Sequence, residues 1–273
     1  MKTIKIFSKN ATYQKFEVLK TNRNKRYKYY EFFVEGVRNI NEAIRNEWTI
    51  VSLIYSGEKP LSDWAKNILK TVKTEVNYQL TDALMSDISS KEDTSELLAI
   101  VKMREDDLRQ IQFHGSPLLA VFDRASNRGN LGTIIRSCDS FGIDGLILTG
   151  HAVDLYDPDV ISSSMGSFFN IPVVRVADNQ TLYDYFSEVR KIHPELQIVG
   201  TTAHKETRIM DVDYTKPTVF MIGNETEGLS KTLRQACDVL MTIPMSDRSS
   251  ASSFNVGCAA TVFFYEAVRQ RLK

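Results

Sequence analysis

Three short segments in the second half of the chain combine glycine with polar side chains in spacings that suit ligand binding. The first reads NRGNLG over residues 127–132 and is followed four residues later by Arg136. A glycine-rich turn that leads into a helix exposes backbone N–H groups and the positive end of the helix dipole, so it can bind an anion such as phosphate. Arg136 lies about one turn further along that helix and could point toward the same anion, and an ordinary tight turn is the alternative interpretation.

The second segment, GNETEGL over residues 223–229, directly follows an apolar run that is typical of a buried strand. Gly223 and Gly228 allow the backbone to turn sharply and to approach a flat ligand closely. Glu225 supplies either an acceptor for that ligand or a negative charge at the start of the next helix. The segment therefore predicts a ligand loop, with a helix-capping carboxylate as the alternative.

The third segment reads IPM over residues 243–245, continues through a serine-rich stretch at residues 246–253, and ends in Phe254 and Asn255. The last helix of the chain is expected to begin close to Ser253 and Asn255. Either side chain could contribute to a ligand site. A helix cap is the alternative interpretation for each of them.

Metal chemistry is not expected from the remaining reactive side chains. The three cysteines are widely spaced without a CxxC pair, and the four histidines lack the spacing of metal ligands. These residues are Cys138, Cys237, Cys258, His114, His151, His193 and His204. The pattern excludes a disulfide scaffold and a sequential zinc site, and it fits a reducing cytosol.

The overall composition narrows the function classes further. Thirty-four basic and 34 acidic residues cancel to a formal net charge of zero, so any argument for binding to nucleic acid or membrane must rest on local patches. A length of 273 residues with 42% apolar side chains favours about two domains with sizeable cores. No apolar run approaches the roughly 18 residues of a spanning helix, and the first residues lack a long apolar segment. We expect a cytoplasmic protein that is neither secreted nor embedded in a membrane.

Apolar runs of strand length alternate with helical patterns along the whole chain, which is typical of an α/β protein. In the first part, strands are expected at residues 32–34, 50–55, 76–80 and 97–101, and helices at residues 37–45, 61–72 and from residue 81. In the second part, strands are expected at residues 118–122, 146–148, 173–176, 198–200, 219–222 and 239–243, and helices at residues 131–140 and 255–272. A mostly parallel sheet with helices on both faces would bury the second set of strands.

A charged stretch at residues 102–116, followed by Pro117, separates the two sets of elements. We therefore expect a smaller domain at residues 1–108 and a second domain at residues 109–273. Ligands of open parallel sheets bind beyond the carboxyl ends of the strands. The three candidate segments follow strands of the second domain, so this domain is expected to carry the ligand site.

Residues 1–30 form a basic arm with nine Lys or Arg residues and a single acidic residue. Its candidate RNA-binding residues are Arg23, Lys25, Arg26 and Lys28, and tyrosines follow within the same stretch. Positive side chains can neutralise phosphates while aromatic rings stack on unpaired bases. The arm therefore predicts contact with RNA, and a solvated helix that leads into a strand is the alternative.

In their order and spacing, the segments NRGNLGTIIRS, IGNETEGLS and IPM...SSFNVGCAA resemble the three signature motifs of the SpoU (TrmH-type) RNA 2′-O-ribose methyltransferases in the SPOUT superfamily. Residues 164–172 are similar to the ligand-loop region of that family, so the resemblance covers residues 117–272. The segment FFVEGVRNINEAI is similar to the L30e-like substrate-binding domain that often precedes the catalytic domain.

The resemblance implies S-adenosylmethionine as methyl donor, a C-terminal α/β-knot domain with a deep trefoil knot, and a homodimer whose active sites form at the subunit interface. It assigns cofactor binding to Thr201, Gly223, Gly228, Ile243, Met245 and Phe254, and catalysis to Asn130, Arg136, Glu225, Ser253 and Asn255. Phe254 replaces the leucine that is usual in the family, and the loop before Ser253 is longer than is common there.

The implied reaction is the in-line attack of a ribose 2′-hydroxyl on the methyl group of the cofactor. Ribosomal RNA, and 23S ribosomal RNA in particular, is favoured because the L30e-like domain resembles that of ribosomal enzymes. Family proposals give the hydroxyl proton to the motif-one arginine, here Arg136, yet a guanidinium with a pKa above about 12 is a poor base. We expect Arg136 to hold a phosphate and position the ribose, while a nearby phosphate or water takes the proton.

Three alternative functions remain open from the sequence. A tRNA 2′-O-methyltransferase would use the same motifs, and an RNA-binding dimer could retain the fold without catalysis. An oxidoreductase that binds a nucleotide would use the glycine loops, but the acidic ribose ligand of such enzymes is missing after residues 146–148. The presence of Asn130, Arg136 and Glu225 argues against the silent dimer.

Overall fold

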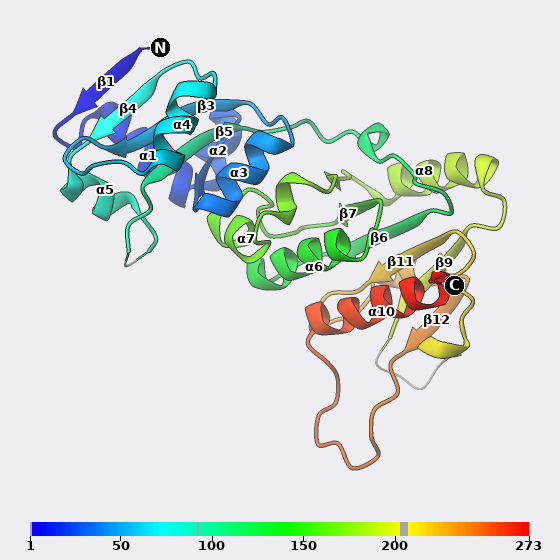
Figure 1. Cartoon of the computed structure of the whole chain (residues 1–273). Helices are drawn as coiled ribbons and strands as arrows, with labels where there is room; N and C mark the ends of the chain where they lie inside the picture. The colour runs from blue at the N-terminus through cyan, green and yellow to red at the C-terminus, as the bar shows by residue number, and fades with distance from the viewer. Residues whose placement is uncertain (1, 92, 203–206, 273) are drawn as a thin grey trace. The chain divides into compact units, whose positions relative to one another are not determined.

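The computed structural model describes residues 2–91, 93–202 and 207–272, which form two compact units. The first unit comprises Met1–Glu105 and Asp154–Asn170, and the second comprises Asp106–Val153 and Ile171–Lys273 (Figure 1). The sequence boundary at residue 108 lies close to the end of the first stretch, but no sequence signal indicated that Asp154–Asn170 returns to the first unit. Within the described ranges, no helix combines the length and apolarity needed to cross a membrane.

A five-stranded sheet forms the centre of the first unit, in the order β1-β4-β3-β5-β2. Its strands are β1 (Thr3–Ile6), β2 (Glu31–Glu35), β3 (Ile50–Ser56), β4 (Asn77–Leu80) and β5 (Leu97–Lys102). Strand β5 runs antiparallel to β2 and β3, whereas β4 runs parallel to β1 and β3. The central strands β3 and β5 are buried over most of their length, which explains why apolar residues predominate in both.

Five helices accompany this sheet: α1 (Ala11–Thr21), α2 (Arg23–Tyr29), α3 (Val37–Arg45), α4 (Asp63–Thr71) and α5 (Asp82–Ile88). The basic arm folds into two of them, because Asn22 ends α1 in an extended conformation and its side chain accepts a hydrogen bond from the Lys25 backbone N–H. Ser62 and Thr81 cap α4 and α5 in the same way. The alternative interpretation of the arm, a helix that leads into a strand, thus agrees with the structure except that two helices precede β2.

The segment Asp154–Asn170 contributes α7 (Pro158–Ser163) and a short 3-10 turn to the first unit. Its aromatic rings pack on those of the L30e-like stretch: the Phe32 ring centroid lies 4.9 Å from that of Tyr156 and 5.8 Å from that of Phe168. The indole N–H of Trp48 donates to the Phe169 carbonyl at 2.9 Å. The stretch that resembles a ligand-loop region therefore serves in part as core of the first unit.

Arg26 is a correction to the sequence analysis. Its side chain is buried, with Nε 2.7 Å from Asp154 Oδ2 and Nη2 3.2 Å from Asp157 Oδ2. The guanidinium also donates to the carbonyls of Leu19 and Lys20 at the end of α1. A side chain that is 1% exposed and committed to four acceptors is not available to bind RNA phosphates. The prediction of an RNA contact at Arg26 is therefore wrong.

Seven strands form the sheet of the second unit, in the order β10-β12-β9-β11-β6-β7-β8, and every neighbouring pair is parallel. The strands are β6 (Leu118–Asp123), β7 (Gly145–Thr149), β8 (Val173–Arg175), β9 (Gln197–Thr201), β10 (Thr207–Arg208), β11 (Thr218–Ile222) and β12 (Val239–Thr242). All residues of β6, β7 and β11 are buried. The expected α/β fold with a parallel sheet is confirmed.

The main helices of the second unit are α6 (Arg128–Ser140), α8 (Asn179–Ile192), α9 (Lys231–Gln235) and α10 (Val256–Arg271). Helices α6 and α10 pack against each other (Figure 1). A Cβ atom at Gly257 would lie only 3.0 Å from Thr133 Cγ2, so the glycine permits the close approach. The hydroxyls of Ser137 and Thr261 share a hydrogen bond of 2.7 Å across the same contact. This packing brings the first and third sequence motifs together.

Candidate active site

A cavity of about 770 Å³ lies in the second unit, beyond the carboxyl ends of β9, β11 and β12. Its walls come from residues 201–202, 222–229, 242–247 and 252–254, from Arg208 and Arg234, and from Val256, Ala259 and Phe263 of α10. Small-molecule and cofactor sites typically have volumes of roughly 300–1,000 Å³. The cavity is therefore large enough for a nucleoside-sized ligand.

The sheet register explains why these segments meet. Gly200 of β9 lies opposite Met221 of β11 on one side and opposite Leu240 of β12 on the other. Parallel strands end at the same edge of a sheet, so the residues that follow these three strands gather there. All six residues expected to bind the cofactor line the cavity: Thr201, Gly223, Gly228, Ile243, Met245 and Phe254.

The loop after β11 folds back on itself and forms one wall of the cavity. Asn224 and Gly228 exchange two backbone hydrogen bonds of 3.0 Å, and Asn224 Oδ1 accepts from the backbone N–H groups of Thr226 and Glu227. Gly228 has a φ of 68°, and a Cβ atom at Gly223 would lie 2.4 Å from the Gly228 carbonyl carbon. The sharp turn predicted from the two glycines is therefore a geometric requirement of the loop.

The carboxylate of Glu225 links the three motifs through hydrogen bonds. Asn130 Nδ2 donates to Glu225 Oε1 at 3.1 Å, and Asn255 Nδ2 donates to Asn130 Oδ1 at 3.0 Å. Burial acts to raise the pKa of Glu225, but hydrogen bonds from Ser126 and Asn130 outweigh it and lower that pKa. Glu225 is thus an ionised acceptor that orients Asn130. The alternative of a helix-capping carboxylate is wrong, because Ser230 is the N-cap of α9.

The other predicted catalytic residues lie in different settings. Asn255 caps α10 by accepting from the backbone N–H groups of Gly257 and Cys258, so it serves both as a cap and as a member of the hydrogen-bonded chain. Ser253 is exposed and lines the cavity. Arg136 is exposed on α6 and, in the described part of the second unit, does not line the cavity.

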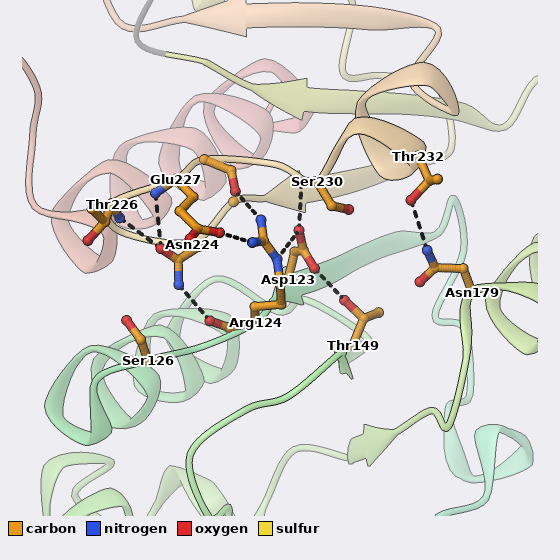
Figure 2. Close-up of polar contacts among 12 residues, drawn as sticks. Asp123, Arg124, Ser126, Thr149, Asn179, Asn224, Thr226, Glu227, Ser230 and Thr232 are labelled. Atoms are coloured by element: carbon orange, nitrogen blue, oxygen red, sulfur yellow. Dashed lines mark hydrogen bonds and ion pairs between the residues drawn. The ribbon is translucent and has the colours of Figure 1, made fainter.

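A group of polar residues that the sequence analysis did not single out lies next to the loop at residues 223–229 (Figure 2). Asp123 ends β6 at 2% exposure, and its carboxylate accepts from Thr149 Oγ1 at 3.1 Å, the Ser230 backbone N–H at 2.8 Å and Arg124 Nε at 3.2 Å. The Arg124 carbonyl accepts from Asn224 Nδ2 at 2.8 Å. In the sequence, the aspartate at the end of a fully apolar run was the signal that could have indicated this group, because a buried carboxylate needs several hydrogen-bond donors around it.

No cluster of three or more His, Cys, Asp or Glu side chains that could hold a metal ion occurs in residues 2–91, 93–202 and 207–272. His204, one of the four histidines considered above, lies outside these described residues. The candidate site therefore consists of the cavity, its loop and the hydrogen-bonded chain of Asn130, Glu225 and Asn255.

Comparison with known proteins assigns the site to a family. The SpoU rRNA Methylase family matches residues 117–265, and the SpoU L30e-like domain matches residues 10–99. The chain belongs to the SpoU rRNA Methylase family. It is 43% identical to the 23S rRNA (uridine(2479)-2′-O)-methyltransferase of Streptomyces viridochromogenes, over 98% of this chain and 93% of that protein.

Two further relatives support the assignment to the SpoU family. The chain is 24% identical to the 23S rRNA (guanosine(2553)-2′-O)-methyltransferase RlmP of Bacillus subtilis, over 94% of this chain and 96% of that protein. The crystal structure of the SpoU methyltransferase AviRb from Streptomyces viridochromogenes in complex with AdoMet matches with a TM-score of 0.91 and 42% identity, over 97% of this chain and 99% of that one.

In this SpoU methylase, the remaining RNA-binding candidates lie on α2 of the L30e-like domain. Arg23 and Lys28 are exposed, and Lys25 is half-buried. The Arg23 guanidinium lies 5.7 Å from the centroid of the Tyr27 ring, a cation–π arrangement. These three residues stay candidates for RNA contact, whereas the buried Arg26 holds the domain together.

Proposed function

We propose that this SpoU methylase transfers a methyl group from S-adenosylmethionine to the 2′-oxygen of a ribose in 23S ribosomal RNA. Two relatives that match nearly the whole chain are 23S rRNA 2′-O-methyltransferases. The observation that carries the proposal is the cavity, which joins the second and third motifs while hydrogen bonds tie them to the first. The names of the two relatives specify different nucleotides, a uridine and a guanosine, so the proposal extends to the RNA and the reaction only.

The cavity residues fit the cofactor. A Cβ atom at Gly223 would collide with the backbone of Gly228, so the glycine permits the tight loop, and residues 223–229 of that loop line the cavity. Ile243 and Phe254 belong to two other segments of the lining. When bound, S-adenosylmethionine supplies an electrophilic methyl group. Thr201, Met245 and Gly228 complete the set of residues that we expect to hold it.

The task of the protein residues is to hold the ribose oxygen in line with that methyl group. Alignment of two bound reactants can lower a barrier by several kcal/mol, on the order of 7 to 11 at best. Asn130, Glu225 and Asn255 form a chain in which each amide orientation is fixed by its neighbour. We expect this chain and Ser253 to orient the hydroxyl and the cofactor loops, and Arg136 to clamp the adjacent phosphate.

A homodimer completes this proposal, because Arg136 does not line the cavity of its own subunit in the described residues. The exposed face of α10 carries Cys258, Val262 and Tyr265 at helical spacing, and the exposed Phe254 lies two positions before the helix. Association of two subunits would remove these side chains from water. We expect that association to bring Arg136 of one subunit to the other subunit's cavity, and we expect the family's trefoil knot in the second unit.

The L30e-like domain is the proposed RNA-binding part. Its α2 carries Arg23, Lys25 and Lys28, and the acidic residues of the chain lie mostly beyond the first thirty positions. Ribosomal RNA is preferred over tRNA because the relatives that match this domain as well as the catalytic one act on 23S rRNA. We place the reaction in the cytoplasm.

Two measurements test the proposal. Calorimetric titration of the protein with S-adenosylmethionine should show binding, whereas a catalytically silent dimer or a nicotinamide-dependent enzyme would show none. The Arg136→Ala variant should bind the cofactor normally but methylate saturating RNA about a hundredfold more slowly in a single turnover. Arg190→Ala, which alters another exposed arginine of the second unit, is the control. A normal single-turnover rate for Arg136→Ala would refute the clamp.

A further inference from the structure

Arg124 occupies an unusual backbone conformation at the end of β6. Its φ is 51°, in the left-handed region that non-glycine residues rarely adopt. Its backbone N–H donates to the Thr149 carbonyl at 3.0 Å. A Cβ atom at the nearby Gly150 would lie 2.6 Å from Arg124 Cγ, so the glycine leaves space for the arginine side chain. The surrounding structure therefore directs this side chain toward the loop (Figure 2).

The guanidinium of Arg124 uses three nitrogens on three different acceptors. Nη2 donates to the Gly228 carbonyl at 2.8 Å, Nη1 pairs with the Glu227 carboxylate, and Nε lies 3.2 Å from Asp123 Oδ2. Partial burial acts to lower the pKa of Arg124, but the carboxylates of Asp123 and Glu227 outweigh it and raise that pKa. The fork geometry of arginine allows this division of donors, whereas a lysine ammonium would reach fewer of them.

These contacts restrain both ends of the turn that forms a cavity wall. The side chain of Arg124 donates to the Gly228 carbonyl, and the backbone carbonyl of Arg124 accepts from the side chain of Asn224. The backbones of Asn224 and Gly228 are in turn hydrogen-bonded to each other. A loop that contains two glycines has many accessible conformations when unrestrained. Fixing the bound conformation beforehand strengthens ligand binding because less conformational entropy is lost on association.

We propose that Arg124 is a positioning residue for cofactor binding, which presets the loop at residues 223–229 through Gly228 and Glu227. The inference rests on the proposed function, because it concerns the same cavity. In the described structure Arg124 itself does not line the cavity, whereas the loop residues that it holds do. Arg124 therefore acts through the loop.

The position of Glu225 predicts a specific kinetic signature. Its carboxylate is held by Ser126 and Asn130, whereas the Arg124 side chain binds Gly228, Glu227 and Asp123. Loss of the arginine should therefore loosen the cofactor wall while the chain from Glu225 to Asn255 persists. The KM for S-adenosylmethionine should rise, and kcat at saturating RNA and cofactor should change little.

The experiment compares the Arg124→Met variant with the wild-type protein in steady-state methylation of ribosomal RNA. Methionine keeps an unbranched side chain at the same backbone position but removes all three hydrogen bonds. We expect the KM for S-adenosylmethionine to rise about tenfold, with kcat within about threefold of the wild-type value. Arg124→Lys should recover part of the affinity, with a KM about threefold above wild type. Arg190→Met, which breaks an ion pair with Asp238 in the same unit, should leave both parameters unchanged.

The outcomes separate this inference from the proposed function. If wild-type protein methylates RNA and Arg124→Met has an unchanged KM for the cofactor, the inference fails while the function stands. A lowered kcat with an unchanged KM would also overturn it, because that result indicates a smaller folded fraction. If wild-type protein does not bind S-adenosylmethionine, both fail together. Should Arg124→Met not fold, Glu227→Gln decides: a KM about twofold to threefold above wild type supports the inference, and an unchanged KM overturns it.

Discussion

Replacing Arg26 by methionine should destabilise the first unit strongly. The guanidinium is buried among four acceptors: Asp154 Oδ2 at 2.7 Å, Asp157 Oδ2 at 3.2 Å, and the carbonyls of Leu19 at 3.0 Å and Lys20 at 2.9 Å. Methionine has a similar length but offers no donor. The variant would leave two carboxylates buried without their positive partner, and it would leave the end of α1 without its cap.

The structure sets the size of this effect. Removing one partner of a buried ion pair typically costs about 3–5 kcal/mol. Asp154 keeps hydrogen bonds from the Tyr27 hydroxyl at 2.9 Å and from the Tyr156 backbone N–H at 3.2 Å, which compensate part of its charge. We therefore expect the lower end, about 3 kcal/mol. With a denaturant slope of about 2 kcal/mol per molar urea, the unfolding midpoint should fall by about 1.5 M.

Tryptophan fluorescence during urea unfolding is a suitable assay for this prediction. The chain has two tryptophans, Trp48 and Trp64, and both lie in the first unit, so the signal reports on that unit. Lys28→Met, on the exposed face of the same helix, is the matched control and should leave the midpoint within about 0.3 M of wild type. A midpoint for Arg26→Met as close to wild type as that of the control would refute the buried-pair reasoning.

Three further predictions concern the other sites. Because the pKa of Glu225 is lowered in the folded protein, its ionised form contributes stability that is fully present above about pH 4.5 and is lost as the pH falls through the lowered value. Glu225→Gln should therefore flatten the acid side of the plot of melting temperature against pH for the second unit. An unchanged acid slope would contradict this. Exchange of Lys25 and Lys28 for glutamate should weaken RNA binding and reduce the slope of log K against log salt concentration by roughly 1.4 in a filter-binding titration. A slope equal to that of the wild-type protein would indicate that these lysines are merely solvated. Asn255→Asp should retain the α10 cap and the melting temperature but lose the hydrogen bond to Asn130, so its methylation rate should fall at least about tenfold. Asn255→Ala should show the same fall in rate and should also lose about 1 kcal/mol of stability, because the cap is lost as well. A wild-type rate for Asn255→Asp would remove Asn130 from the proposed chain.

Strands buried on both faces were the most predictable elements of the fold. The apolar run at residues 118–122 became β6 and the run at residues 219–222 became β11, because every position of such a strand contacts core. The short edge strands β1 and β10 had no such signal, since most of their side chains are exposed. Their pairing depends on neighbouring strands rather than on their own sequence.

Charged side chains show the limit of sequence reasoning most directly. Arg26 and Lys28 lie two positions apart in the same basic run, yet one is buried and the other is exposed. The partners of Arg26 are 128 and 131 positions further along the chain. No local pattern reveals that Asp154 and Asp157 return to the first unit and neutralise this charge.

The sequence by itself determined the turns, the helix starts and the residues that can accept or donate hydrogen bonds, because these depend on neighbours within a few positions. Gly223 and Gly228 required their sharp loop, and Asn255 required no distant partner to begin α10. The tertiary structure alone decided that Asn130 meets Glu225, 95 positions away, and Asn255, 125 positions away. Such contacts depend on the order of strands in the sheet and on the packing of α6 against α10, which arise from burial summed over the whole unit.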